Sequence, residues 1–220
     1  MALVFDIETV GQAVDSLPPR VIDYLFERLE KNRYGGPEAD IGDEERSRRR
    51  EEAIDRFSLD PTTGSVVCIG LIETDSGREE TLVVDASHTE HDVLTRFWDA
   101  VREPPARWVS FNGKRFDVPY LKLRSAILGV APSVVIEETR GTTSPHFDVY
   151  EVLAGFDTRR KGNLDYFSAI FGLDSPKTLM DGSLVGAAYR AGRIDEIAAY
   201  CLADCRATAA LFERLRPFYG

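Results

Sequence analysis

The sequence predicts an α/β protein in which a mixed β-sheet is flanked by helices. Three apolar segments with strand-like alternation come first, and amphipathic helical segments then alternate with short strands. A chain of 220 residues with 43% hydrophobic content suits one globular domain with a good core. We therefore expect a single domain over residues 1–220, with one insertion. No apolar run approaches the roughly 20 residues that span a bilayer, so no membrane partner is expected.

The first predicted strand, residues 2–9, carries two acidic residues one position apart. In the stretch "LVFDIETVG" the side chains alternate, so Asp6 and Glu8 point to the same face. Two neighbouring carboxylates repel each other, and each is costly to bury without a compensating positive charge. A divalent cation is the simplest candidate, and the rest of the chain must then supply further oxygen ligands.

Residues 15–57 differ in character from the flanking sequence. Two charged amphipathic segments, "PRVIDYLFERLEKNR" and "GDEERSRRREEAIDRF", flank the breaker "YGGPEADIG". We predict an inserted pair of helices with a packing face of Ile22, Leu25, Phe26 and Leu29. Its role stays open between a lid, a dimer contact and a site for a protein partner.

The remaining elements follow from the same reasoning. A hairpin is predicted over 63–74 and 79–86, with "DSG" as its turn. A helix over 89–102, a strand over 107–112, a helix over 116–128 and a strand or strand–helix junction over 145–153 follow. Three helical stretches, 163–171, 181–191 and 193–216, complete the chain. This order of elements is that of a ribonuclease-H-like fold.

A third carboxylate, Asp117, stands just after the strand that ends at Asn112. Open sheets place ligand sites at strand ends and helix starts, so Asp117 is a candidate for the same cleft as Asp6 and Glu8. The alternative is that Asp117 only caps the helix.

The last helix carries the fourth candidate carboxylate, Asp204, four residues after Tyr200. Residues four apart lie one above the other on a helix, so a tyrosine hydroxyl and a carboxylate there can orient a water molecule. The alternative is a tyrosine with a buried ring beside an ordinary surface aspartate.

Together, "FDIET", "FNGKRFDVPYL" and "YCLAD" resemble the three exonuclease motifs of the DEDD superfamily of 3′–5′ exonucleases. The middle motif and the tyrosine most resemble the proofreading domain of family-B DNA polymerases and its stand-alone relatives. The resemblance runs from residue 3 to about residue 215, except for the insertion. Members with a catalytic histidine carry it at the position of Ala199, so Tyr200 indicates the tyrosine subclass.

This resemblance implies a two-metal phosphodiester hydrolase. Asp6, Glu8, Asp117 and Asp204 would hold two Mg²⁺ or Mn²⁺ ions, hard cations that prefer oxygen ligands. Asp6 would bridge both ions, Glu8 and Asp204 would serve the ion that activates water, and Tyr200 would position that water. The reaction would release nucleoside 5′-monophosphates from the 3′ end of single-stranded nucleic acid, with DNA favoured over RNA.

Substrate contacts are predicted around the second motif. Asn112 would face the terminal nucleotide, and Phe116 and Tyr120 would stack on bases, core packing being the alternative for both rings. The loop 157–163 is the best local basic segment for a nucleic-acid backbone. Further candidate cations are Lys114, Arg115, Lys122 and Arg124.

The net charge of −10 argues against a protein that holds long duplexes mainly by their phosphates. Binding would depend on a local groove and metal ions. A non-catalytic nucleic-acid-binding or scaffolding protein on the same fold, an endonuclease and a short-oligonucleotide hydrolase remain alternatives. Three cysteines without a metal-finger pattern, and an N-terminus without a basic leader, predict a reducing cytoplasm.

Overall fold

The computed structural model describes residues 1–30, 42–157, 161–174 and 180–220. The chain forms two compact units. The larger unit joins Met1–Thr9 to Val66–Gly220, and the smaller unit comprises Val10–Ser65. The boundaries of the smaller unit enclose the segment 15–57 that the sequence marks as different.

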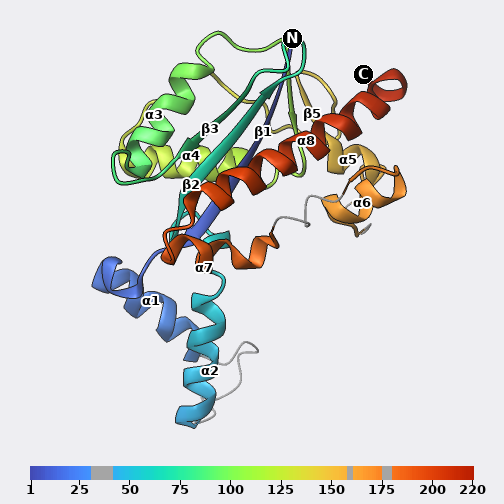
Figure 1. Ribbon diagram of the computed structural model, residues 1–220. Coiled ribbons are helices and arrows are strands. Elements are labelled where there is room, and N and C mark those ends of the chain that lie inside the picture. The colour runs from blue at the N-terminus through green and yellow to red at the C-terminus, as the bar shows by residue number, and fades with distance from the viewer. Residues whose placement is uncertain (31–41, 158–160, 175–179) are drawn as a thin grey trace. The chain divides into compact units, whose positions relative to one another are not determined.

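A five-stranded mixed sheet forms the centre of the larger unit, in the order β3-β2-β1-β4-β5 (Figure 1). Strands β1 and β4 pair in parallel, as do β4 and β5, whereas β2 and β3 form the predicted antiparallel hairpin. The bounds of the strands are Ala2–Gly11 (β1), Gly64–Glu73 (β2), Glu79–Val83 (β3), Arg107–Ser110 (β4) and His146–Asp148 (β5). The predicted α/β, ribonuclease-H-like arrangement is confirmed.

The helices agree with the expected order along the chain. In the larger unit they are α3 (Glu90–Ala100), α4 (Asp117–Leu128), α5 (Val149–Leu153), α6 (Leu164–Ile170), α7 (Val185–Arg190), which follows the 3₁₀ turn η4 (Gly182–Leu184), and α8 (Ile194–Tyr219). Among the helices of the described residues, none combines the length and the apolar character needed to cross a bilayer.

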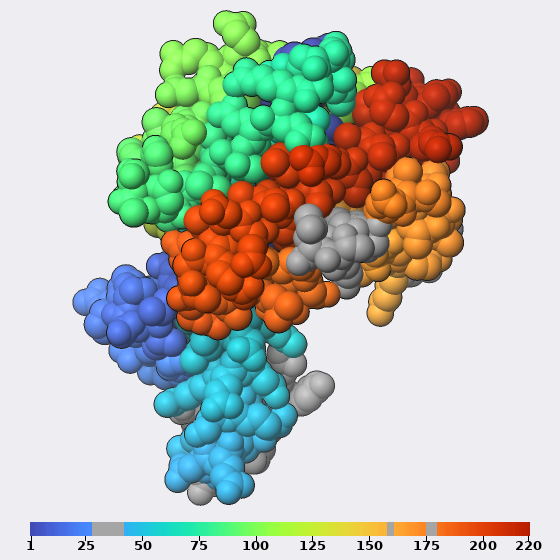
Figure 2. Space-filling model, in the orientation of Figure 1, coloured from blue at the N-terminus to red at the C-terminus, as the bar shows by residue number. Residues whose placement is uncertain are grey.

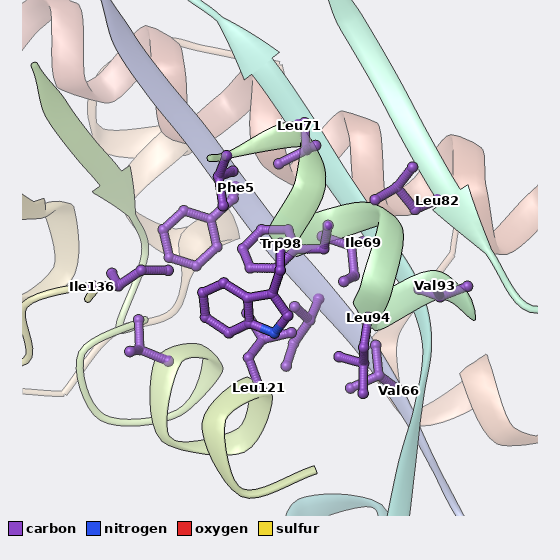
Figure 3. Packing of buried hydrophobic residues seen from close by; sticks show 14 of the residues in the cluster. Phe5, Val66, Ile69, Leu71, Leu82, Val93, Leu94, Trp98, Leu121 and Ile136 are labelled. Atoms are coloured by element: carbon purple, nitrogen blue, oxygen red, sulfur yellow. The ribbon is translucent and has the colours of Figure 1, made fainter. Parts of the chain in front are cut away.

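One face of the sheet packs against α3 and α4. Leu3, Phe5 and Ile7 of β1 point to this side and enter one hydrophobic cluster with the apolar residues of both helices. Figure 3 shows the indole of Trp98 at the centre of this cluster, between Phe5, Ile69 and Leu121. Alternate residues of β1 therefore bury an apolar face, as its sequence predicts.

The opposite face of the sheet packs against α5, α6 and α8. Ala2 and Val4 of β1 join a second cluster that includes Leu211, Phe212 and Leu215 of α8. In the space-filling view α8, in red, forms a ridge between the β2–β3 segment, in green, and α6, in light orange (Figure 2). Since side chains alternate, Asp6 and Glu8 continue the row that Ala2 and Val4 begin.

The smaller unit contains α1 (Pro19–Glu30), α2 (Asp43–Ile54) and the 3₁₀ turns η1 (Val14–Ser16) and η2 (Phe57–Leu59). The two predicted helices are thus present. Of the predicted packing face, Ile22, Leu25 and Phe26 are partly buried, and the side chain of Leu29 lies outside the described part. The guanidinium of Arg50 lies 4.9 Å from the centre of the Phe26 ring.

Candidate active site

Asp6 and Glu8 bring two carboxylates to the middle of β1, on the face that α8 covers. One carboxylate oxygen of each and the sulfur of Cys201 on α8 lie within 4.8 Å of one another. The Cys201 thiol approaches the backbone oxygen of Asp6 at 3.5 Å and its Oδ2 at 3.7 Å. Strand β1 and helix α8 thus meet at the paired carboxylates that the sequence singles out.

Asp117 is the first residue of α4, but it does not cap the helix. The N-cap residue is Phe116, and its side chain makes no capping hydrogen bond. Instead, Oδ1 of Asp117 accepts a hydrogen bond of 3.2 Å from the backbone amide of Ile7. Because Ile7 stands between Asp6 and Glu8, this bond holds the third carboxylate beside the first two.

Helix α8 adds Tyr200 and Asp204, whose side chains are joined by a hydrogen bond. The tyrosine is 7% exposed, so its ring is buried while its hydroxyl meets the carboxylate. Both residues line a pocket of about 210 Å³ together with Asp6. The other residues that line it are Phe111, Asn163, Leu164 and Asp165.

The electrostatics of the four carboxylates show how closely they are grouped. Burial, followed by the charges of the other three, raises the pKa of Asp6 well above its usual range. Burial and the charges of Asp204 and Asp117 do the same for the pKa of Glu8. Burial also raises the pKa of Asp117 to about 7, although the amide of Ile7 opposes this shift. Asp6, Glu8 and Asp117 are thus destabilised in their charged forms by burial and by neighbouring carboxylates.

This donor set fits hard divalent cations such as Mg²⁺ or Mn²⁺. Asp6, Glu8, Asp117 and Asp204 offer carboxylate oxygens, the ligands such cations prefer, and cations would offset their mutual repulsion. Cys201 lies within the same cluster, but its thiol is fully buried, and a hydrogen bond with the Cys205 thiol, followed by burial, raises its pKa well above the usual range. We therefore treat the thiol as a hydrogen-bond donor to Asp6.

The three predicted substrate contacts differ in their exposure to solvent. Asn112 and Phe116 are partly exposed near the start of α4. Tyr120 is 1% exposed and belongs to the α3–α4 core, with its ring 5.4 Å from that of Phe116. A ring buried in this way offers no face to a base, so we do not retain Tyr120 as a substrate contact.

Most of the predicted cations are engaged in ion pairs. Lys114 is buried against Glu151 at 3.2 Å, Lys122 pairs with Glu138, and Arg124 pairs with Glu90 at 2.6 Å. Arg115 is exposed on the loop before Asp117. Of the predicted basic loop, residues 158–160 lie outside the described residues.

The sequence interpretation missed several residues of the pocket. Phe111 precedes Asn112 and resembles any core residue of a strand end in the sequence. Asn163 is the last residue of the loop 157–163, which is predicted to contact nucleic acid through its lysine and arginines and not through this asparagine. The one signal that points to it is an asparagine before a helix: its Oδ1 accepts from the amide of Tyr166 at 2.8 Å, which caps α6.

Fold and site define this protein as a nuclease-related α/β protein of the ribonuclease-H-like class. The chain belongs to the family described as "Predicted 3'-5' exonuclease related to the exonuclease domain of PolB", which matches residues 56–220. The matched segment contains Asp117, Tyr200 and Asp204. Asp6 and Glu8 precede it, and the structure joins them to the same site.

Similar proteins include archaeal DNA polymerases. The chain is 30% identical over 157 residues to a DNA polymerase of Thermococcus gorgonarius, which covers 61% of this chain and 19% of the polymerase. It is 28% identical over 153 residues to DNA polymerase 1 of Sulfolobus acidocaldarius, covering 66% of this chain and 17% of that protein. The chain thus spans less than a fifth of the length of these relatives.

A solved structure shares the fold. The family B DNA polymerase from the hyperthermophilic archaeon Pyrobaculum calidifontis matches 99% of this chain and 24% of its own, with a TM-score of 0.65 and 24% sequence identity. The resemblance to 3′–5′ exonucleases that the sequence predicts is confirmed by family membership, and the shared fold agrees with it.

Proposed function

We propose that this protein is a metal-dependent 3′–5′ exonuclease that removes nucleoside 5′-monophosphates from the 3′ end of single-stranded nucleic acid, DNA more than RNA. The observation that carries the proposal is the convergence of four carboxylates and a tyrosine around strand β1. A purely structural cluster of like charges would be unfavourable in a buried position. Family membership agrees with nuclease chemistry.

In this proposal Asp6, Glu8, Asp117 and Asp204 would hold two divalent cations, Mg²⁺ or Mn²⁺. Such ions, when bound, polarise the phosphoryl oxygen and activate water for in-line displacement. The protein's part is to hold four carboxylates close together, and metal binding would favour their deprotonated forms. The three buried thiols of the chain agree with a reducing compartment such as the cytoplasm.

Tyr200 is proposed to position the attacking water. Burial and the charge of Asp204 raise the pKa of its hydroxyl, so the group stays protonated at neutral pH. A protonated hydroxyl that donates to Asp204 can accept a hydrogen bond from water, but it cannot serve as the base. Tyr200 therefore orients the water and does not take its proton.

The pocket beside these groups is proposed to receive the terminal nucleotide. Its lining offers an aromatic ring from Phe111 and an amide from Asn163, next to Asp6 and Asp204. Base–aromatic stacking contributes roughly 1–3 kcal/mol per base and tolerates different sequences. Asn112 and Phe116 are proposed as further contacts at the mouth of the site.

The proposal is tested with a single-stranded DNA oligomer labelled at its 5′ end, and an RNA oligomer of the same sequence. Each is incubated with wild type, Asp6→Asn and Asp92→Asn, in Mg²⁺, Mn²⁺ or chelator. Asp92 completes the capping box of α3, whose N-cap is Thr89, and lies outside the pocket lining, so its variant controls for loss of a carboxylate. We expect a metal-dependent ladder that shortens from the 3′ end with wild type and Asp92→Asn, and none with Asp6→Asn.

Other outcomes discriminate the alternatives. Internal cuts would indicate an endonuclease, and cleavage of only very short oligomers would indicate an oligonucleotide hydrolase. An oligomer that is bound but stays intact in every metal, with folded wild-type protein, would overturn the proposal in favour of a non-catalytic binding protein.

A further inference from the structure

We propose that Asp148, at the end of β5, is a positioning residue for Asp117 and acts through the loop 111–116 that joins β4 to α4. The proposal rests on the proposed function, since it assigns a second carboxylate to the placement of a metal ligand. Asp148 contributes no lining to the pocket and is 1% exposed. Its role must therefore lie in the contacts of its carboxylate.

The Asp148 carboxylate accepts hydrogen bonds from three backbone amides. Its Oδ1 accepts from Asn112 at 2.9 Å and from Glu151 at 3.2 Å, and its Oδ2 accepts from Lys114 at 3.1 Å. The bond to Glu151 caps α5, as an aspartate before a helix commonly does. The other two bonds reach across to the loop, so one side chain ties α5 to the chain that leads into Asp117.

The loop needs such a constraint because its backbone is unusual. Asn112 has a φ of 64°, in the left-handed region that few side chains adopt. At Gly113 a Cβ atom would lie 2.3 Å from the Oγ of Ser110, so the backbone passes closer to the Ser110 side chain than a residue with a Cβ atom would allow. Conformations of this kind cost about 1–3 kcal/mol each and persist only where neighbouring structure holds them.

A second contact reinforces the first. The ammonium group of Lys114 is fully buried, 3.2 Å from Oε2 of Glu151 and 2.6 Å from the carbonyl oxygen of Thr142. The loop is therefore joined to α5 by the backbone of Lys114 through Asp148 and by its side chain through Glu151. The buried cation also offsets the buried negative charges of Asp148 and Glu151.

The loop in turn sets the position of Asp117. The amide of Val118 donates to the carbonyl of Gly113 at 2.9 Å, so the first turn of α4 begins on the constrained loop. Asp117 Oδ1 then meets the amide of Ile7 at 3.2 Å. If Asp148 releases the loop, Asp117 shifts, and the amide of Ile7 loses its acceptor at the start of α4.

The Ile7 amide provides a readout that a capping role alone would not change. Hydrogen exchange of this amide is measured by NMR in metal-free wild type, Asp148→Asn, Asp148→Ser and the control Asp92→Asn. Asparagine has the same shape but places a donor where Asp148 has a second acceptor. Serine keeps an N-cap oxygen for α5 but is too short to hold the loop.

We expect the Ile7 amide to exchange at least about 10-fold faster in both Asp148 variants, and at the wild-type rate in Asp92→Asn. Mn²⁺ affinity, titrated without substrate, should weaken about 10–100-fold in the Asp148 variants, the usual effect of losing a partner behind a metal ligand. The serine variant decides the question if the asparagine variant folds poorly, because it retains the helix cap.

The proposal is overturned if Asp148→Ser matches wild type in Ile7 exchange and in Mn²⁺ affinity, because Asp148 would then only cap α5. Failure of the proposed function looks different. Wild type would bind Mn²⁺ and leave every oligomer intact, while the Ile7 amide still responded to Asp148.

Discussion

At the scale of single residues, the site is a group of like charges that folding forces together. Burial raises the pKa values of Asp6, Glu8 and Asp117, and the charges of neighbouring carboxylates add to each shift. The metal-free protein must therefore either retain protons on them or accept their repulsion. Cations relieve this conflict, and the stability of the protein should report it.

The first prediction concerns pH and the metal-free protein. Asp117 has a folded-state pKa of about 7 against an ordinary value of 3.8, so between these values the folded state binds the proton and the unfolded state does not. The stability that this group contributes is complete below pH 4 and is lost as pH rises through about 7. In chelator, the free energy of unfolding should fall from pH 5 to pH 7, by up to about 1.4 kcal/mol per pH unit for one proton.

Urea unfolding in chelator and in Mn²⁺ checks this prediction. Saturating Mn²⁺ should abolish or reverse the slope, because metal binding requires deprotonated ligands. The variant Asp117→Asn should have a shallower slope in chelator. A metal-free stability that rises between pH 5 and pH 7 would contradict the electrostatic account.

The second prediction concerns the hydroxyl of Tyr200. Tyr200→Phe keeps the buried ring but removes the group that meets Asp204. Turnover should fall on the order of 10²-fold, the loss that a reacting group misplaced by about 1 Å can cause. The dissociation constant for the oligomer should change little. Tyr189→Phe, a partly buried tyrosine on α7, is the matched control, and equal turnover in both variants would count against the role of Tyr200.

At the scale of elements, the candidate active site depends on how closely α8 approaches the sheet. Gly70 of β2 faces this helix, and a Cβ atom there would lie 2.9 Å from the sulfur of Cys205 and 3.0 Å from that of Cys201. Because Gly70 has no side chain, α8 can pack closely against β2 at Cys201 and Cys205. Tyr200 and Asp204 lie on the same helix, so their positions depend on this contact.

The third prediction follows from that packing. Gly70→Ala should destabilise the protein by about 1–3 kcal/mol, as overpacked cores do, and should lower turnover by displacing α8. Adding Cys205→Ala should recover part of both losses, because it removes one of the two sulfur contacts. Gly186→Ala is the control, since its Cβ would meet only the Arg190 side chain at 3.6 Å. Wild-type stability and turnover in Gly70→Ala would show that the contact is not limiting.

Local patterns in the sequence were sufficient for the elements and for much of the candidate site. Strand alternation placed Asp6 and Glu8 on one face, and helical spacing placed Tyr200 beside Asp204. The partners of Lys114 could not be predicted in this way, because Glu151 is 37 positions away and meets it only in the folded chain. The burial of Tyr120 likewise depends on how α3 packs beside α4.

At the scale of the whole molecule, we propose that Val10–Ser65 is an insertion into a single exonuclease domain. The two hydrophobic clusters of the described chain draw their residues from 2–7 and 66–215. The ends of the insertion lie close together, since the amide of Gln12 donates to the carbonyl of Thr63 at 2.9 Å. The larger unit thus has its own core. The inserted segment leaves and returns at neighbouring positions of the chain's path.

The fourth prediction tests this organisation. Replacing residues 13–62 by a two-residue Asn-Gly turn, which suits a hairpin, should leave a folded protein that retains metal-dependent cleavage. Circular dichroism, thermal unfolding and the oligomer assay would check it. A shortened protein that folds but loses only substrate affinity would assign the insertion a binding role, for nucleic acid or for a protein partner. A shortened protein that does not fold would contradict the proposal.

The bond between Cys201 and Asp6 has a consequence for biosynthesis. It joins residues 195 positions apart, so β1 cannot contact Cys201 until nearly all of the described domain has been translated. Contacts this distant in sequence form late, because closing so long a loop costs entropy before any contact repays it. A ribosome-bound chain that lacks α8 carries Asp6 and Glu8 without Tyr200 and Asp204. Under the proposed function, the nascent protein is therefore inert toward the messenger and the other nucleic acids around it, and it gains its cleaving activity only after α8 has been synthesised and has folded.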